Sequence, residues 1–183
     1  MSRALRLVPA ALALAAAPAA AESELGFTHP AELCIEERAD AEFAGPYLDL
    51  ILDRSGPKDR AIKLRDDFAV LANACIKQHG EPRNSPAHVG ELITAAMIRN
   101  EALRRLAARA VDTAWVIAAV DRAKSASGGD LSVTNDAVAA LMREAPPEGL
   151  SIDLRGGSEL RVLISAYALG TIRLAKLRSL TAR

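Results

Sequence analysis

Residues 159–178, ELRVLISAYALGTIRLAKLR, are the stretch that decides the fold class. At helical spacing their apolar side chains cover nearly the whole circumference: Leu160, Val162, Leu163, Ile164, Tyr167, Leu169 and Ile172. Such a helix must be buried by other helices, and Ala166 and Gly170 would let one of them come close. We therefore expect an all-α protein, a bundle of six or seven helices around a buried C-terminal helix.

Upstream, helical spacing and breaks predict the remaining helices. Ser85 and Ser158 are N-cap candidates, and Gly80 suits a helix C-terminus. The stretch from Pro86 to Lys124 is either one long helix or two; we favour two, with Asp112 or Thr113 capping the second. The other predicted helices are Ala31 to Ala44 (ended by Gly45-Pro46), Tyr47 to Arg54, Ala61 to about Gly80, and Thr134 to Glu144, with Ser151 to Leu154 as a loop.

The first 21 residues have the pattern of a signal peptide. Arg3 and Arg6 precede an uncharged stretch, and Ala19 and Ala21 form an A-x-A cleavage site. A membrane anchor is the alternative, but the stretch is short for a span and contains two prolines. We expect cleavage after Ala21, a single helical domain over residues 22–183, and residence in the bacterial periplasm or outside the cell, with no transmembrane segment in the mature chain.

Two cysteines remain after cleavage, Cys34 and Cys75. An oxidising compartment favours their pairing, and no C-x-x-C motif is present. A reactive thiol or an intermolecular bridge are the alternatives. We expect one structural disulfide, which would join two packed helices because Cys75 lies on the apolar stripe of its helix.

Motifs for catalysis and for metal binding are weak. The sequence has no G-x-S-x-G, and its glycine pairs match no phosphate-binding loop. His79, His88 and Met97 could ligate a transition metal, but they lack a recognised ligand spacing. The sequence therefore favours a protein without a catalytic site, a metal or a cofactor.

Charge is balanced in total but segregated along the chain. Twenty-three basic and 23 acidic side chains give a net charge of +0, which argues against nucleic acid as a partner. Acidic residues dominate Glu22 to Ser55, whereas basic ones prevail from Gly56 onward. The arginine cluster of Arg99, Arg104, Arg105 and Arg109 has two interpretations. It either pairs internally, with Glu101 and Asp112, or forms a surface for a charged protein partner.

These observations favour a non-catalytic periplasmic protein that binds another protein, of the inhibitor, immunity-protein or adaptor type. The alternative is a helical bundle that binds a small ligand or a metal ion between its helices. A shallow apolar patch rimmed by charge would support the first function. A deep apolar pocket with convergent polar groups would support the second.

Overall fold

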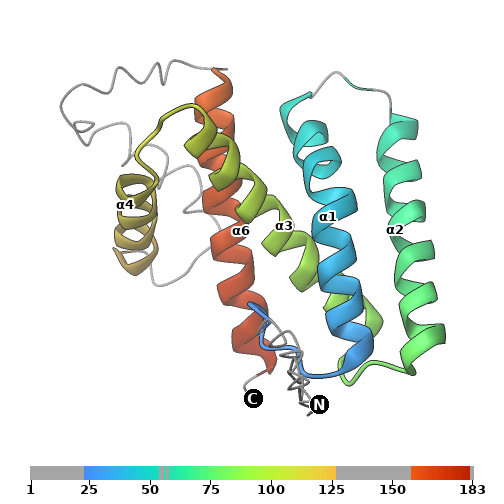
Figure 1. Ribbon diagram of the computed structural model, residues 1–183. Helices are drawn as coiled ribbons and strands as arrows, with labels where there is room; N and C mark the ends of the chain where they lie inside the picture. The colour runs from blue at the N-terminus through green and yellow to red at the C-terminus, as the bar shows by residue number, and fades with distance from the viewer. Residues whose placement is uncertain (1–22, 54–55, 57, 127–157, 182–183) are drawn as a thin grey trace, which may run out of the picture.

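The computed structural model describes residues 23–53, 56, 58–126 and 158–181, and within these it is entirely helical (Figure 1). Five helices are present in the described residues: α1 (Pro30–Leu52), α2 (Lys58–His79), α3 (Pro86–Ala108), α4 (Thr113–Ala126) and α6 (Glu159–Thr181). The predicted all-α class is confirmed. No helix in this part of the chain is long and apolar enough to cross a membrane.

The helices form two groups that share α1 and α3. On one side, α2 lies alongside α1; on the other, α6 packs along α3 and also contacts α1 and α4 (Figure 1). The α3–α6 contact is the most extensive in the fold. The predicted burial of the C-terminal helix therefore arises mainly from its packing against α3.

Helix starts follow the predicted caps. The Ser85 hydroxyl accepts a hydrogen bond from the His88 N–H at 3.3 Å, and that of Ser158 accepts one from the Arg161 N–H at 3.3 Å. Asp112 Oδ1 accepts from the N–H groups of both Ala114 and Trp115, at 3.0 and 3.2 Å. Because these bonds satisfy free N–H groups at helix starts, the stretch from Pro86 forms two helices, as expected.

The predicted break at Gly45-Pro46 is wrong, because α1 continues through Pro46 to Leu52. A proline inside a helix removes one backbone hydrogen bond, here the one to the carbonyl of Glu42. Tertiary contacts offset this loss. Arg105 of α3 donates hydrogen bonds to the Gly45 carbonyl at 3.3 Å and to Asp49 at 2.6 Å, and so holds α1 on both sides of the proline.

The predicted total of six or seven helices is not confirmed. Two predicted segments, Ala31 to Ala44 and Tyr47 to Arg54, are one helix in the structure. The predicted helix Thr134 to Glu144 and the predicted loop Ser151 to Leu154 lie outside the described residues.

Two hydrophobic clusters stabilise the arrangement. The first joins the C-terminal ends of α1 and α3 to α4 and to the N-terminal half of α6. The second joins α1, α2 and α3 to the end of α6 and includes Phe27, from the segment before α1. At Gly170 of α6, an added Cβ would lie 2.7 Å from the Ala95 carbonyl oxygen of α3, so glycine permits the close approach predicted there.

The predicted disulfide is present. Cys34 of α1 and Cys75 of α2 are bonded, with their Cα atoms 5.8 Å apart. Cys75 is fully buried and Cys34 is half-buried. The bond therefore joins the N-terminal third of α1 to the C-terminal third of α2.

Candidate functional site

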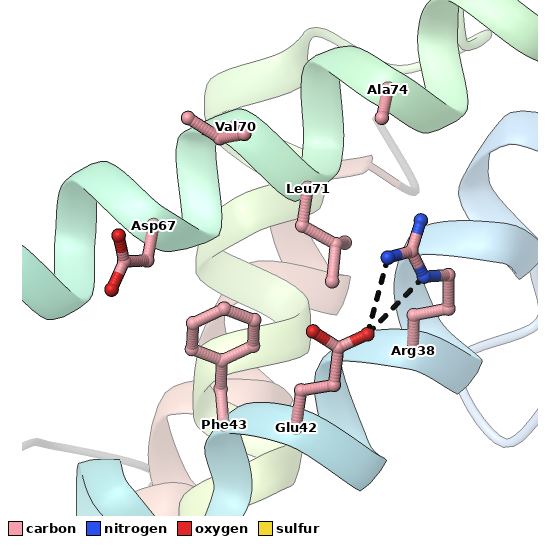
Figure 2. A pocket seen from close by; sticks show the side chains of 7 residues that line it. All are labelled: Arg38, Glu42, Phe43, Asp67, Val70, Leu71 and Ala74. Carbon is pink, nitrogen blue, oxygen red and sulfur yellow. Dashed lines mark hydrogen bonds and ion pairs between the residues drawn. The ribbon is translucent and has the colours of Figure 1, made fainter.

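An open groove of about 360 Å³ lies between α1 and α2 (Figure 2). In Figure 2, Phe43 points from α1 towards α2, and Leu71 points from α2 towards α1. Both side chains are almost fully buried. The groove is lined by Arg38, Glu42 and Phe43 of α1 and by Asp67, Val70, Leu71 and Ala74 of α2.

The floor of the groove is apolar because it is the edge of the second hydrophobic cluster. Phe43 packs edge-on against Phe68 of α2, with ring centroids 5.8 Å apart. Leu71 occupies the same cluster, one helical turn from Cys75. The disulfide and these rings hold α1 and α2 at the spacing that leaves the groove open.

Val70 differs from its neighbour Leu71 in that 69% of its surface is exposed, whereas Leu71 is 4% exposed. A second apolar side chain of α2, Ile62, is also about half exposed. Single exposed apolar residues are ordinary, but Val70 adjoins the apolar floor and extends it to the surface. Together, Phe43, Leu71, Val70 and Ala74 form a shallow apolar strip.

Charged side chains make the rim. Arg38 Nη2 lies 3.2 Å from Glu42 Oε1 on α1, and Lys63 Nζ lies 2.7 Å from Asp67 Oδ2 on α2. Both pairs are exposed and four residues apart on one helix, so each stabilises the fold by at most about 0.5 kcal/mol. A binding partner could therefore displace either pair at little cost.

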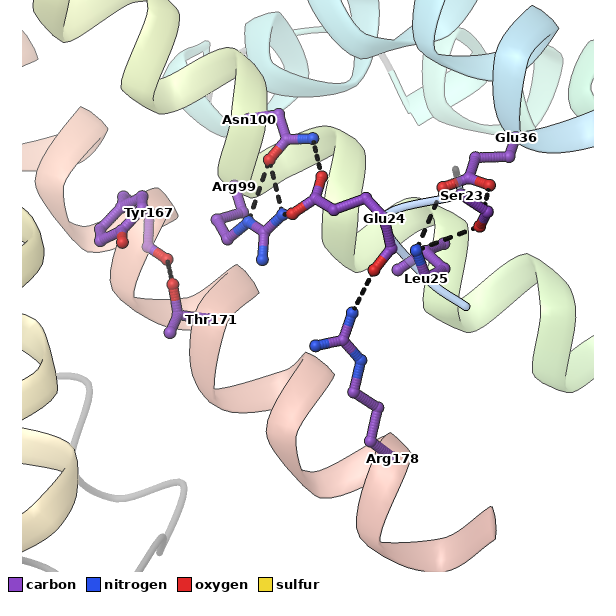
Figure 3. Close-up of polar contacts among 9 residues, drawn as sticks. All are labelled: Ser23, Glu24, Leu25, Glu36, Arg99, Asn100, Tyr167, Thr171 and Arg178. Carbon is purple, nitrogen blue, oxygen red and sulfur yellow. Dashed lines mark hydrogen bonds and ion pairs between the residues drawn. The ribbon is translucent and has the colours of Figure 1, made fainter. Parts of the chain in front are cut away.

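Arg99 and its surroundings form a second polar cluster (Figure 3). The Arg99 guanidinium pairs with the carboxylate of Glu24, which also accepts a hydrogen bond from Asn100 Nδ2 at 2.9 Å. The backbone carbonyl of Glu24 accepts a bond from Arg178 of α6 at 2.8 Å. Burial lowers the pKa of Arg99, and the nearby positive charge of Arg178 lowers it further. These contacts tie the segment before α1 to α3 and α6.

The same N-terminal segment is also attached to α1. The Ser23 hydroxyl donates to Glu36 at 2.5 Å, and the Leu25 N–H lies 3.4 Å from the same carboxylate (Figure 3). Glu36 therefore has a defined structural role, although by sequence alone it resembles any other acidic residue on a solvated helix face.

Arg104 and Arg105 both pair with Glu101, as the internal interpretation expected. Glu101 is 3% exposed, and Arg105 Nε donates to its Oε1 at 2.7 Å. Arg105 also reaches Asp49 on α1, and its side chain is 23% exposed. Arg104 pairs with the other carboxylate oxygen of Glu101, although 71% of its own side chain is exposed. The buried carboxylate thus accounts for the position of both arginines.

Arg109 pairs with a residue that was not expected. Its guanidinium binds Glu159, at the start of α6, and donates to the Arg105 carbonyl at 3.1 Å. Asp112, the predicted partner, instead caps α4. The structure therefore places each of the four candidate arginines in an ion pair with a described residue.

The weak metal candidates lie in different environments. His79 is exposed at the end of α2, His88 is in the first turn of α3, and Met97 is buried in the second cluster. No group of three or more His, Cys, Asp or Glu side chains in the described residues could hold a metal ion.

No protein-family model matches this chain, and no curated protein and no solved structure matches it.

Proposed function

We propose that this is a non-catalytic, exported protein that binds another protein, of the inhibitor, immunity-protein or adaptor type, in the groove between α1 and α2. The observation that carries the proposal is the form of the groove, which is open, has an apolar floor and has a rim of weakly paired charges. Ligand pockets enclose their ligands and present convergent polar groups, whereas protein-docking patches are shallow and rimmed by charge.

Export with cleavage after Ala21, and residence in the periplasm, belong to the same proposal. The Cys34–Cys75 bond supports it because structural disulfides persist in oxidising compartments. The N-terminal pattern of Arg3, Arg6 and an A-x-A site also supports it, because this pattern is typical of a signal peptide.

The occupant of the groove is an amphipathic helix of the partner. Two neighbouring helices leave a groove parallel to their axes, and an apolar stripe on a third helix fills such a groove. Val70 supplies an exposed apolar contact at its edge.

The flanks of that partner helix are charged. The rim of the groove carries the two exposed ion pairs Arg38–Glu42 and Lys63–Asp67, and charges of the partner would pair with these groups. The association should therefore weaken as salt is added.

The test compares two substitutions at neighbouring positions of α2. Val70→Glu places a charge on the apolar strip, whereas Ala69→Glu places the same charge on an exposed residue that does not line the groove. Neither side chain is buried, so both variants should fold with unchanged helix content and denaturation midpoint.

Each protein is immobilised, and captured proteins from the periplasmic extract of the native host are quantified one by one. The proposal expects a protein that binds the wild type and the Ala69→Glu variant but binds the Val70→Glu variant at least about tenfold less. Equal capture by both variants, or capture of a second copy of this chain alone, would overturn it.

A contribution from the arginine cluster is testable at Arg104, which has the most exposed side chain of the four. If the cluster contacts the same partner, Arg104→Gln lowers capture and its salt dependence. Unchanged capture would assign Arg104 solely to its ion pair with Glu101.

A further inference from the structure

α2 is attached to the rest of the fold mainly through one neighbour, α1. Of the described helices, only α1 runs alongside it (Figure 1). Only Leu71 and Cys75 of its 22 residues are buried, whereas α3 buries nine. Further side chains of α2 are partly buried against the second cluster, and one of them, Phe68, lies close to Gly90 of α3: Leu64, Phe68, Ala72 and Ile76.

The polar contacts of α2 do not hold it to the other helices. Its ion pairs with described residues, Lys63–Asp67 and Arg65–Asp66, both lie within α2. By contrast, α1 is held to α3 by the hydrogen bonds from Arg105 to Asp49 and to the Gly45 carbonyl. Helices with few buried contacts and exposed backbone are the ones that open first in native proteins.

Covalent connections compensate for this. The chain joins the N-terminal end of α2 to α1 and its C-terminal end to α3, and the disulfide joins its C-terminal third to α1 across a sequence separation of 41 residues. The disulfide is the one of these connections that can open, and while it holds, α2 cannot move away from α1 as a unit.

We infer that the Cys34–Cys75 bond is a redox latch: its reduction by a dithiol releases α2 from α1 while α1, α3 and α6 stay folded. A thiolate of the dithiol attacks Sγ of Cys34, the less buried of the two cysteines, and forms a mixed disulfide. The bond to Cys75 breaks, and the Cys75 thiolate takes up a proton. The second thiol of the dithiol then attacks the mixed disulfide and leaves as a cyclic disulfide, and Cys34 becomes a thiol. Two electrons and two protons pass from the dithiol to the protein.

Because α1 stays folded on release, the loop that the disulfide closes in the released state is about 23 residues long, and reduction should make release of α2 about three-hundredfold more frequent. The released state exposes Phe43 and Leu71, the floor of the groove, because each comes from one of the two helices. Loss of partner binding on reduction rests on the proposed function, whereas the release itself does not.

Hydrogen exchange of the full mature chain, read by mass spectrometry with and without dithiothreitol, tests the latch without any partner. In the reduced protein, the amides of α2 should exchange at least about a hundredfold faster than those of residues 93–97 in α3 and 163–168 in α6. In the oxidised protein, the amides at the core of α2 should be protected.

Two results would overturn the inference. If α2, α3 and α6 exchange at one common rate after reduction, the protein opens as a single unit. If α2 keeps its protection after reduction, non-covalent packing alone holds it.

Two variants complete the experiment. Cys34→Ser/Cys75→Ser should reproduce the exchange pattern of the reduced protein in the absence of reductant, and reduced wild type serves if this variant does not fold. Oxidised Phe68→Ala, which removes the main aromatic contact of α2, should keep the C-terminal third of α2 protected because the latch is intact. If the amides of that third exchange as fast as they do in the reduced wild type, Phe68 and not the disulfide holds the helix.

Discussion

Replacement of glycine by alanine should have opposite effects on stability at two positions: Gly170, where α6 contacts α3, and Gly90, where α3 contacts α2. At Gly170 of α6, a new Cβ would lie 2.7 Å from the Ala95 carbonyl oxygen, 2.8 Å from the Arg99 Cβ and 3.0 Å from the Arg99 backbone nitrogen. At Gly90 of α3, it would lie 3.6 Å from the Phe68 ring, an ordinary contact.

Both positions gain about 1 kcal/mol from the better helix propensity of alanine. At Gly170 this gain is outweighed, because the neighbouring atoms belong to the backbone and Cβ of α3 and cannot rotate away. The two helices must separate along the most extensive contact of the fold, and overpacking of this kind costs about 1 to 3 kcal/mol. Gly170→Ala should therefore lower the free energy of unfolding by up to about 2 kcal/mol, whereas Gly90→Ala should raise it by up to about 1 kcal/mol.

Urea unfolding followed by far-ultraviolet circular dichroism, with the disulfide intact, measures both variants against the wild type. Midpoints that move in opposite directions at an unchanged m-value are the expected result. The reasoning is refuted if Gly170→Ala is as stable as the wild type, because α6 then does not approach α3 as closely as described.

Three further predictions concern other parts of the fold. Arg105→Ala should cost about 3 kcal/mol of stability by urea unfolding, because it removes a donor from the buried Glu101 carboxylate; an unchanged midpoint would contradict this role. Ala110→Gly should stabilise by about 1 kcal/mol in the same assay, since Ala110 has φ 56, a left-handed conformation that glycine adopts without strain; a lower midpoint would speak against that conformation. Burial raises the pKa of Tyr47 and Tyr167 above 10.0, so the folded state favours the neutral phenols. Their contribution to the free energy of unfolding should be complete below about pH 10 and should be lost as the pH rises through the raised pKa values. Unfolding midpoints that stay constant across that pH range would exclude the effect.

Local signals in the sequence predicted the all-α fold class and the starts of three helices. Ser85, Asp112 and Ser158 cap helices through bonds to residues two or three positions away, so short sequence windows contain the whole interaction. The continuation of α1 through Pro46 could not be predicted in this way, because its stabilising partner, Arg105, lies on another helix about sixty residues further on.

The candidate surface was missed for a related reason. An apolar residue in a helix is normally assigned to the core, and only packing shows that Val70 is exposed. A weak signal was present: the apolar stripe of α2 runs through Leu64, Phe68, Leu71 and Cys75, and Val70 does not fit its spacing. The arginine partners show the same limit, since Glu159, which pairs with Arg109, begins a helix 50 residues away.

Site-specific photo-cross-linking at Val70 tests the central claim most directly. A photoreactive amino acid replaces Val70 in one variant and the exposed Gln78, which does not line the groove, in another, and both are irradiated in cells of the native host. Docking in the groove predicts an adduct at position 70 with an amphipathic helix of a different protein, and none at position 78. Adducts of equal yield at both positions, or no adduct at position 70, would contradict it.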